Sequence, residues 1–265
     1  MTNNDGIDRE SETPLQAVLL CDSFTNTFRP ASLDTPKVLC PLNNVTLIDY
    51  TLQWLHSQQV QEVVVFAVNQ ADKIERHFGR SSWSSLMKIT IVKNTDCSNP
   101  GDALREIDKQ AIVRSDPFIC VSGDVVANIE TAKAIAEHKK RKAVDSANMM
   151  TVMLKQVPVH SNLRTVSDDL VVGMNEDTNQ IVLFEDNLAE SAVQLPSSFM
   201  DAHKSMVVRA DLSDTGVYIC SPDVLARFSD EFDYRSIGKK FICNSVAEEE
   251  EGLQNRIFAH VLDSK

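Results

Sequence analysis

Glycine and proline are scarce in this chain, with eight glycines and nine prolines among 265 residues. Collagen-like repeats and low-complexity linkers need far more of both, so the composition excludes them. No uninterrupted apolar stretch approaches the roughly 18 residues that a membrane-spanning helix needs, so we expect no membrane partner. Yet 43% of the residues are hydrophobic, which is enough for one large domain with its own core.

Positive charge is in deficit, because 26 Lys and Arg residues face 38 Asp and Glu residues and leave a net charge of −12. Sequence-independent binding to nucleic acid needs a basic surface, so we expect no direct nucleic-acid partner. A basic or mixed protein partner stays compatible with this charge. Residues 1–13 are polar and acidic and lack the positive and apolar regions of a signal peptide. They predict a disordered acidic tail on a cytosolic protein.

The sequence lacks the spacing of cysteine and histidine residues that is typical of metal sites. None of the six cysteines belongs to a C-x-x-C pair, and the six histidines show no ligand spacing. Zinc sites are built on such close pairs. We therefore predict structural thiols in a reducing compartment, with no metal and no cofactor.

Strands and helices alternate in the first half of the sequence. Strand-like apolar runs occupy residues 16–21, 62–68, 87–92 and 117–124. Helical patterns lie between them, at residues 46–58, from Asn69 onward, at 99–112 with Asn99 as the cap, and after Asn128 as the cap. This alternation predicts an α/β fold of three layers, in which helices cover both faces of a Rossmann-like mixed, mostly parallel sheet.

The pattern changes after about residue 147, where strands follow one another with few helices between them. The strand-like runs are residues 148–157, 170–175, 180–186, 205–212 and 216–221. We expect them to complete the same sheet, so that residues 14–265 form one domain. Helices are expected at 222–228 and 234–246, a solvated turn at the glutamate run 248–252, and a closing strand at 255–262.

The loop after the first strand raises the question of function. Loops in this place often bind phosphate and are rich in glycine, because only glycine lets backbone N–H groups crowd a phosphate. Residues 21–37 contain no glycine and carry Asp22, Phe24 and Phe28 instead. The loop nevertheless ends in Arg29 and Lys37, spaced as in a nucleotide-handling loop.

A second segment with possible chemistry is Gly123-Asp124, at the end of the fourth predicted strand. Ligands of open α/β sheets bind beyond the carboxyl ends of strands. A carboxylate there can hold Mg²⁺, and Lys37 can neutralise a transferring phosphate. The simpler interpretation is that Gly123-Asp124 is a turn and Lys37 an exposed loop lysine. The residues alone leave both interpretations open.

Taken in order along the chain, these segments resemble the sugar-nucleotide pyrophosphorylases, or nucleotide-diphospho-sugar transferases, over residues 15 to about 262. The residues that match the first-loop pattern of that family are Pro30, Pro36, Lys37, Pro41, Leu42, Ile48 and Tyr50. Gly123-Asp124 matches the metal-binding position of the family. The resemblance implies the nucleotide-diphospho-sugar transferase fold.

The departures from that family predict a pseudoenzyme. Asp22, Ser23 and Thr25 replace the glycines that would admit a triphosphate. A carboxylate within about 5 Å of phosphate costs more than about 1 kcal/mol even when partly solvated. The later E-K-P motif appears as Glu185-Asp186-Asn187, without the lysine. We therefore expect no catalytic residue, and a vestigial nucleotide site made of Asp22, Arg29, Lys37 and Asp124.

One branch fits these departures: the chain resembles the N-terminal domain of the epsilon subunits of translation initiation factor 2B. The segments that carry the resemblance are LQAVLLCDSFTNTFRPASLDTPKVLCPL, LIDYTL, VQEVVVFAV, SDPFICVSGDVVANI and DLSDTGVYICSPDVLARFSDEFDY. The resemblance implies a role in GDP–GTP exchange on initiation factor 2, through scaffold and substrate contacts. It implies the gamma subunit, the other subunits of factor 2B and the initiation factor 2 GTPase as partners. The family's β-helix and C-terminal helical-repeat domain have no counterpart in these 265 residues.

The resemblance also implies a contact with the initiation factor 2 GTPase through an Asn-Phe motif, which falls on Glu231 and Phe232. Glutamate replaces the asparagine and cannot donate a hydrogen bond as an amide does. The residues alone favour a core aromatic beside Tyr234 for Phe232, and the resemblance sets the contact role beside that interpretation. Two further hypotheses stay open: an active Mg-dependent sugar-phosphate nucleotidyltransferase that uses Lys37 and Asp124, and a free-standing structural protein that inherits the fold.

Overall fold

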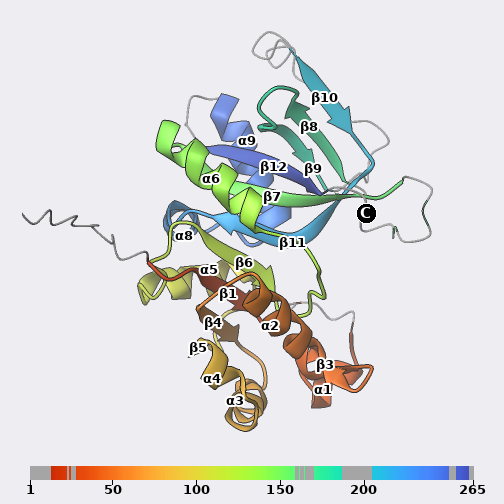
Figure 1. Cartoon of the computed structure of the whole chain (residues 1–265), viewed down its shortest axis with the longest axis vertical. Coiled ribbons are helices and arrows are strands. Elements are labelled where there is room, and N and C mark those ends of the chain that lie inside the picture. Colours follow the sequence, from red (N-terminus) through yellow and green to blue (C-terminus); the bar gives the residue numbers. More distant parts are fainter. Residues whose placement is uncertain are drawn as a thin grey trace, which may run out of the picture.

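The computed structural model describes residues 13–22, 24, 28–158, 161, 164, 170–186, 205–250 and 255–262 (Figure 1). The predicted tail, residues 1–13, lies outside these ranges except for Thr13. In the described part, no helix is long and apolar enough to cross a membrane.

Within the described residues, seven strands form the main sheet in the order β12-β7-β11-β6-β1-β4-β5. The strands are β1 (Gln16–Leu20), β4 (Glu62–Ala67), β5 (Lys88–Lys93), β6 (Phe118–Ser122), β7 (Asn148–Gln156), β11 (Leu212–Cys220) and β12 (Arg256–Leu262). Strand β11 runs antiparallel to its neighbours β6 and β7, and the other adjacent pairs are parallel. Six strands therefore share one direction, and the prediction of a mixed, mostly parallel sheet is confirmed.

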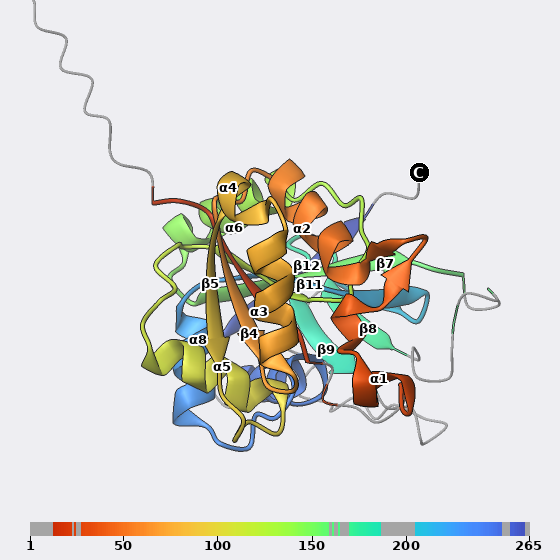
Figure 2. The same cartoon turned by 90° about the horizontal axis from the view of Figure 1, so that it is seen from below.

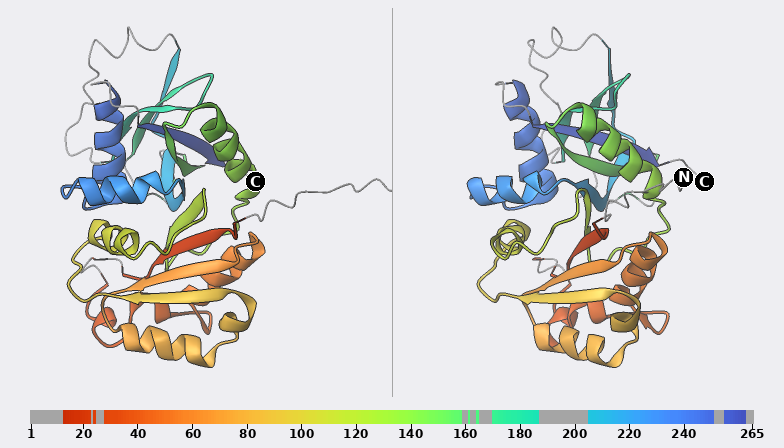
Figure 3. Two further views of the ribbon diagram at one scale, coloured as in Figure 1. Left: turned by 90° about the vertical axis from the view of Figure 1, so that its left-hand side faces the viewer. Right: turned by 60° about the vertical axis from the view of Figure 1, so that its left-hand side comes forward.

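Helices cover both faces of this sheet. They are α2 (Leu47–Ser57), α3 (Ala71–Arg80), α4 (Trp83–Leu86), α5 (Pro100–Lys109), α6 (Ala132–Val144), α8 (Asp223–Asp230) and α9 (Cys243–Glu250), which a π-helical turn (Ile237–Ile242) precedes. Side chains alternate along the strands, so that Val18 packs into one core with α5, α8 and α9, whereas Leu19 packs into a second core with α2, α3 and α6. Figure 2 shows α3 along β4, and in Figure 3 the helices α8 and α9 lie on the opposite side of the strands from α6.

The smaller elements depart from the expected single sheet. Strands β8 (Val171–Asn175), β9 (Ile181–Glu185) and β10 (Met206–Arg209) form a separate antiparallel sheet in the order β10-β8-β9. Of the five strand-like runs in the second half, only those of β7 and β11 join the main sheet. The chain between β1 and α2 contains α1 (Ala31–Asp34), a 3₁₀ turn (Lys37–Leu39) and a hairpin of β2 (Pro41–Leu42) and β3 (Val45–Thr46).

Helix ends test the capping predictions. Asn99 caps α5 as expected, because its side chain accepts a hydrogen bond from the Asp102 N–H. The prediction for Asn69 was wrong: α3 begins at Ala71, after Gln70 in the left-handed region (φ +53°). Asn128 does not cap either, since α6 begins at Ala132 after Thr131. The glutamate run was expected to be a turn, but α9 continues through Glu250.

Candidate functional site

The carboxyl edge of the sheet gathers the residues of the predicted vestigial site. Strand β1 lies between β4 and β6 in parallel register, with Leu20 paired to Phe66 on one side and to Ser122 on the other. The three strands therefore end together. Asp22 follows β1, Asn69 follows β4 and Asp124 follows β6, so that the three side chains meet at one edge.

Asp22 is bonded to the end of β4. One carboxylate oxygen accepts the backbone N–H groups of Val68 at 2.7 Å and Asn69 at 3.1 Å, and the other accepts the Asn69 side-chain amide at 3.0 Å. Asn69 is therefore engaged with Asp22 and does not cap α3. Glycine at position 22 would leave these three donors without an acceptor, so Asp22 closes the loop onto the protein itself.

Lys37 and Asp124 pair with each other. The Lys37 ammonium forms an ion pair with one oxygen of Asp124, and the Ser122 hydroxyl donates to the other. Burial alone would raise the pKa of the Asp124 carboxyl, but the hydrogen bonds from Lys37 and Ser122 outweigh burial and lower it. The Lys37 ammonium also lies 5.9 Å from the centre of the Phe28 ring. The positive charge of Lys37, which would otherwise meet a phosphate, is thus neutralised by Asp124.

Gly123 is required by packing at this edge. A Cβ atom at this position would lie 2.9 Å from a methyl carbon of Val38 and 3.3 Å from the Cα of Cys21. The Gly123 N–H donates to the Leu20 carbonyl at 2.8 Å, and the Thr51 hydroxyl on α2 donates to the Gly123 carbonyl at 3.1 Å. Gly123 thus serves the close approach of β6 and β1, with no ligand needed to explain it.

The other residues of the first loop are placed less centrally. Arg29 is exposed, and no described side chain pairs with its guanidinium group. Phe24 has a left-handed backbone (φ +50°) and its ring packs against the core on the α5 side. Ser23 and Thr25, the two other glycine replacements, lie outside the described residues, as does Asn187.

Sequence reasoning missed Asp214, which lies in β11 near Asp186. The Tyr218 hydroxyl donates to one Asp214 oxygen at 2.6 Å and the Gly216 N–H to the other at 2.9 Å. Burial raises the pKa of Asp214, and the charge of Asp186 adds to this effect. A single carboxylate in a β-strand gives no signal in the sequence, because only the fold brings it near Asp186.

Phe232 lies on the surface, 74% exposed, and is therefore not a core aromatic. Its neighbours Asp230, Glu231 and Asp233 are exposed as well, whereas Tyr234 is buried and packs edge-on against Phe228. The sequence therefore places one unburied aromatic ring among three carboxylates, just after α8.

Two residues of α5 fix the loop that carries Phe232. The Arg105 guanidinium donates to the carbonyls of Phe228, Glu231 and Tyr234 at 2.9, 3.4 and 3.4 Å, and lies 5.4 Å from the Phe232 ring centre. Gly101 admits the loop backbone, because a Cβ there would be 1.9 Å from the Tyr234 carbonyl oxygen. The exposed ring therefore stands on a rigid support.

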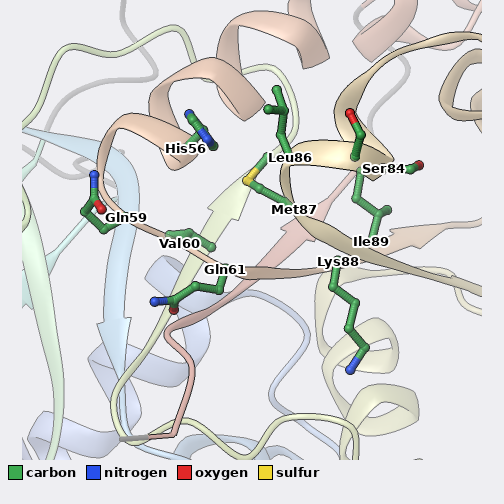
Figure 4. A pocket seen from close by; sticks show the side chains of 10 residues that line it. His56, Gln59, Val60, Gln61, Ser84, Leu86, Met87, Lys88 and Ile89 are labelled. Atoms are coloured by element: carbon green, nitrogen blue, oxygen red, sulfur yellow. The ribbon is translucent and has the colours of Figure 1, made fainter.

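Two cavities lie apart from the residues predicted for the vestigial site. A groove of about 620 Å³ lies at the amino edge of the sheet, where α2 ends and β4 and β5 begin (Figure 4). Its walls include His56, Gln61 and Lys88, and it touches none of the predicted site residues. A second cavity, of about 590 Å³, begins at Val125 on the carboxyl edge.

The chemistry of the donor set does not fit a resident metal. Among the residues that the structure describes, no group of three His, Cys, Asp or Glu side chains gathers in a way that could hold a metal ion. At the predicted site, Asp124 already pairs with Lys37, and Asp22 accepts three N–H donors.

Comparison with known proteins identifies one matching family model and several similar proteins. The model of the family described as Nucleotidyl transferase matches residues 17–246. The chain is 37% identical over 258 residues to translation initiation factor eIF2B subunit epsilon of Dictyostelium discoideum, and 34% identical over 268 residues to that of Schizosaccharomyces pombe. These alignments cover 97% and 98% of this chain but 36% and 39% of the relatives, so the chain spans just over a third of their length.

The fold is also similar to solved structures. HddC from Yersinia pseudotuberculosis superposes with a TM-score of 0.63 over 93% of this chain and 90% of that one, at 15% identity. At this identity the likeness concerns the fold alone, and it confirms the predicted transferase-type fold. The resemblance to epsilon subunits is confirmed by the two alignments. The chain belongs to the nucleotidyl transferase family.

Proposed function

We propose that this chain is the nucleotidyltransferase-like part of an epsilon subunit of initiation factor 2B, and that it promotes GDP–GTP exchange on initiation factor 2 by scaffold and substrate contacts in the cytosol. Its partners would be the gamma subunit, the other subunits of factor 2B and the initiation factor 2 GTPase. The similarity to two epsilon subunits over nearly the whole chain is the observation on which this proposal rests.

The geometry of the nucleotide edge supports a role without nucleotidyl transfer. Asp22 occupies the N–H donors at the end of β4, and Lys37 is paired with Asp124. A triphosphate would have to break both arrangements and would meet the Asp22 carboxylate. The edge therefore favours a pseudoenzyme over the alternative of an active Mg-dependent sugar-phosphate nucleotidyltransferase.

The geometry of the 228–234 loop supports a contact role for Phe232. Exposed aromatic rings on rigid supports are the usual anchors of protein interfaces, because little entropy is lost when they bind. Glu231 bonds to its surroundings through its backbone groups, to Arg227, Tyr234 and Arg105. Its carboxylate is therefore available to a partner, but as an acceptor only.

The test is to co-express the chain with the gamma subunit of its own source, purify the complex, and measure the exchange of labelled GDP on initiation factor 2. We expect stable co-purification and binding to initiation factor 2. Phe232→Ala should weaken that binding at least tenfold, as loss of an aromatic anchor does. Leu86→Ala is the matched control, because Leu86 is also exposed (52%) but lies on α4.

Two results would contradict the proposal. One is the absence of pairing with the gamma subunit. The other is turnover of a nucleoside triphosphate and a sugar phosphate by the purified chain, which Lys37→Ala or Asp124→Asn abolishes. That second result would establish the transferase alternative instead. Pairing without any effect of Phe232→Ala would retain the scaffold role and reject the contact role of Phe232.

A further inference from the structure

Helix α6 concentrates positive charge on a chain whose net charge is −12. Five of the 26 Lys and Arg residues of the chain lie in the 13 residues of this helix, together with a single acidic residue, Glu137. The helix packs on the outside of the sheet against β7 and β12 (Figure 1). It is therefore a local basic surface on an acidic molecule.

The inner side of α6 is fixed to the sheet. His138 is fully buried, and its two ring nitrogens lie 3.1 Å from the hydroxyl groups of Thr151 and Ser221. The guanidinium carbon of Arg141 lies 4.6 Å from the centre of the Phe258 ring on β12. The side of the helix that faces solvent is therefore held in one place by packing beneath it.

The basic residues in the second half of α6 differ in their partners. Lys142 forms an ion pair with Asp223 of α8. Lys139 and Lys140 are exposed, and neither has a carboxylate partner among the residues that the structure describes. The helix dipole favours positive charge only within the last turn, which begins at Arg141. It does not account for the two lysines before that turn.

Apolar side chains lie on the same exposed face as these lysines. Val144 is 85% exposed, more than any other large apolar residue that the structure describes. Ala136 and Ala143 are exposed as well. Lys140 follows Ala136 by four residues and precedes Val144 by four, as Lys139 precedes Ala143, and residues with this spacing are neighbours on a helix surface. These five residues, Ala136, Lys139, Lys140, Ala143 and Val144, form what we call the α6 face.

We propose that the α6 face docks an acidic amphipathic helix of a partner protein. Carboxylates of that helix would pair with Lys139 and Lys140, and its apolar side chains would lie on Val144 and the two alanines. Opposite charges across an interface steer association and fix the register of the partners. Amphipathic helices are common ligands of surfaces that combine apolar contact area with charge.

The charge of the chain favours this occupant over two others. A second copy of the α6 face would bring lysines against lysines, and like charges repel. A nucleic acid is a long polyanion that would extend beyond α6 over the rest of an acidic surface, whereas nucleic-acid binding needs a basic footprint. A short acidic helix, in contrast, meets the positive charge where it is concentrated.

The test is fluorescence anisotropy of the purified chain with a labelled helical peptide that carries leucines on one face and glutamates beside them. We expect saturable binding at low ionic strength that weakens as salt is added. Lys139→Ala/Lys140→Ala should weaken it by about fivefold, since each exposed ion pair contributes little, and should reduce its salt dependence. Val144→Asn should also weaken binding but leave the salt dependence unchanged, because this substitution removes apolar contact and no charge.

Lys109→Ala/Lys240→Ala is the matched control, because it removes the same charge from two exposed lysines on the opposite face of the sheet, in α5 and in the π-helical turn. Binding should be unchanged in this variant. The urea midpoint of each variant distinguishes lost binding from lost folding.

Three results would overturn the proposal. One is the absence of saturable binding of the peptide at about 50 mM salt. Another is binding that Lys139→Ala/Lys140→Ala leaves unchanged, or that the control variant weakens equally. The third is an oligouridine RNA that binds more tightly than the peptide and displaces it, since the occupant would then be a nucleic acid.

Discussion

His138 makes the stability of this fold depend on pH. The ring is fully buried in α6, with one nitrogen 3.1 Å from the Thr151 hydroxyl and the other 3.1 Å from the Ser221 hydroxyl. Burial lowers the pKa of His138 from 6.5 to about 4, and the nearby charges of Lys142 and Arg141 add to this effect. The ring is therefore neutral in the folded chain at neutral pH.

The sign and the size of the effect follow from linkage. Because the folded pKa lies below the unfolded one, the unfolded chain binds the proton first as the pH falls, and stability is lost between pH 6.5 and about pH 4. The full shift of 2.5 pKa units, which is 6.5 minus 4, corresponds to about 3.4 kcal/mol. Between pH 7.5 and pH 5.0 the His138 contribution to the unfolding free energy should fall by about 2 kcal/mol.

The assay is urea unfolding at pH 7.5 and pH 5.0 for the wild type and for His138→Gln. Glutamine is neutral at both pH values and keeps hydrogen-bonding groups near Thr151 and Ser221. The loss of stability on going to pH 5.0 should be about 2 kcal/mol larger in the wild type, whereas carboxylate titrations cancel between the two chains. An equal pH dependence of both chains would refute this reasoning. So would an imidazole that titrates by NMR near pH 6.5 in the folded protein.

Three further substitutions test close contacts. One lies in α5 beneath the Phe232 loop, and the other two lie just after β1 and β6. Gly101→Ala should lower the free energy of unfolding by about 2 kcal/mol or more in urea, because its Cβ would lie 1.9 Å from the Tyr234 carbonyl oxygen; an unchanged midpoint would reject the close approach. Gly123→Ala should cost about 1–3 kcal/mol through contact with Val38, measured the same way, and wild-type stability would contradict the packing role. Asp22→Ala should cost about 1–3 kcal/mol, since the N–H groups of Val68 and Asn69 lose their acceptor; thermal unfolding gives the comparison, and no loss would show that the loop is not latched there.

The sequence predicted the elements whose signals are local. The apolar runs of β1, β4, β5 and β6 appear in one sheet as expected. Strands β1, β4 and β6 lie inside the sheet and are buried on both faces, which requires continuous apolar residues. Asn99 was identified as a cap because Pro100 fixes the first helical turn after it. In these cases the residues that decide the structure are neighbours in the chain.

Predictions failed where a distant contact decides. Asparagine is a residue type that often caps helices. In this chain, however, the Asn69 side chain and backbone N–H both donate hydrogen bonds to Asp22, 47 positions away in the sequence. The glutamates after Ala247 were expected in a turn, yet α9 extends through Glu250. A strand-like run in the sequence does not indicate which sheet the strand will join. The separate sheet of β8, β9 and β10 was therefore not predicted. The sequence alone could not assign Phe232 to the core or the surface, because the loop that exposes its ring is supported by distant residues of α5, Arg105 and Gly101.

Retention of Lys37 and Asp124 does not by itself indicate catalysis. The pair is partly buried, and removal of Lys37 alone would leave the Asp124 carboxylate with Ser122 as its remaining side-chain donor. An uncompensated charge in a partly buried place is costly. Lys37 also lies in the 3₁₀ turn whose next residue, Val38, packs against Gly123. Packing and charge balance therefore give each of these residues a structural role that persists without a nucleotide, whereas Asp22 has a role that a nucleotide would disrupt.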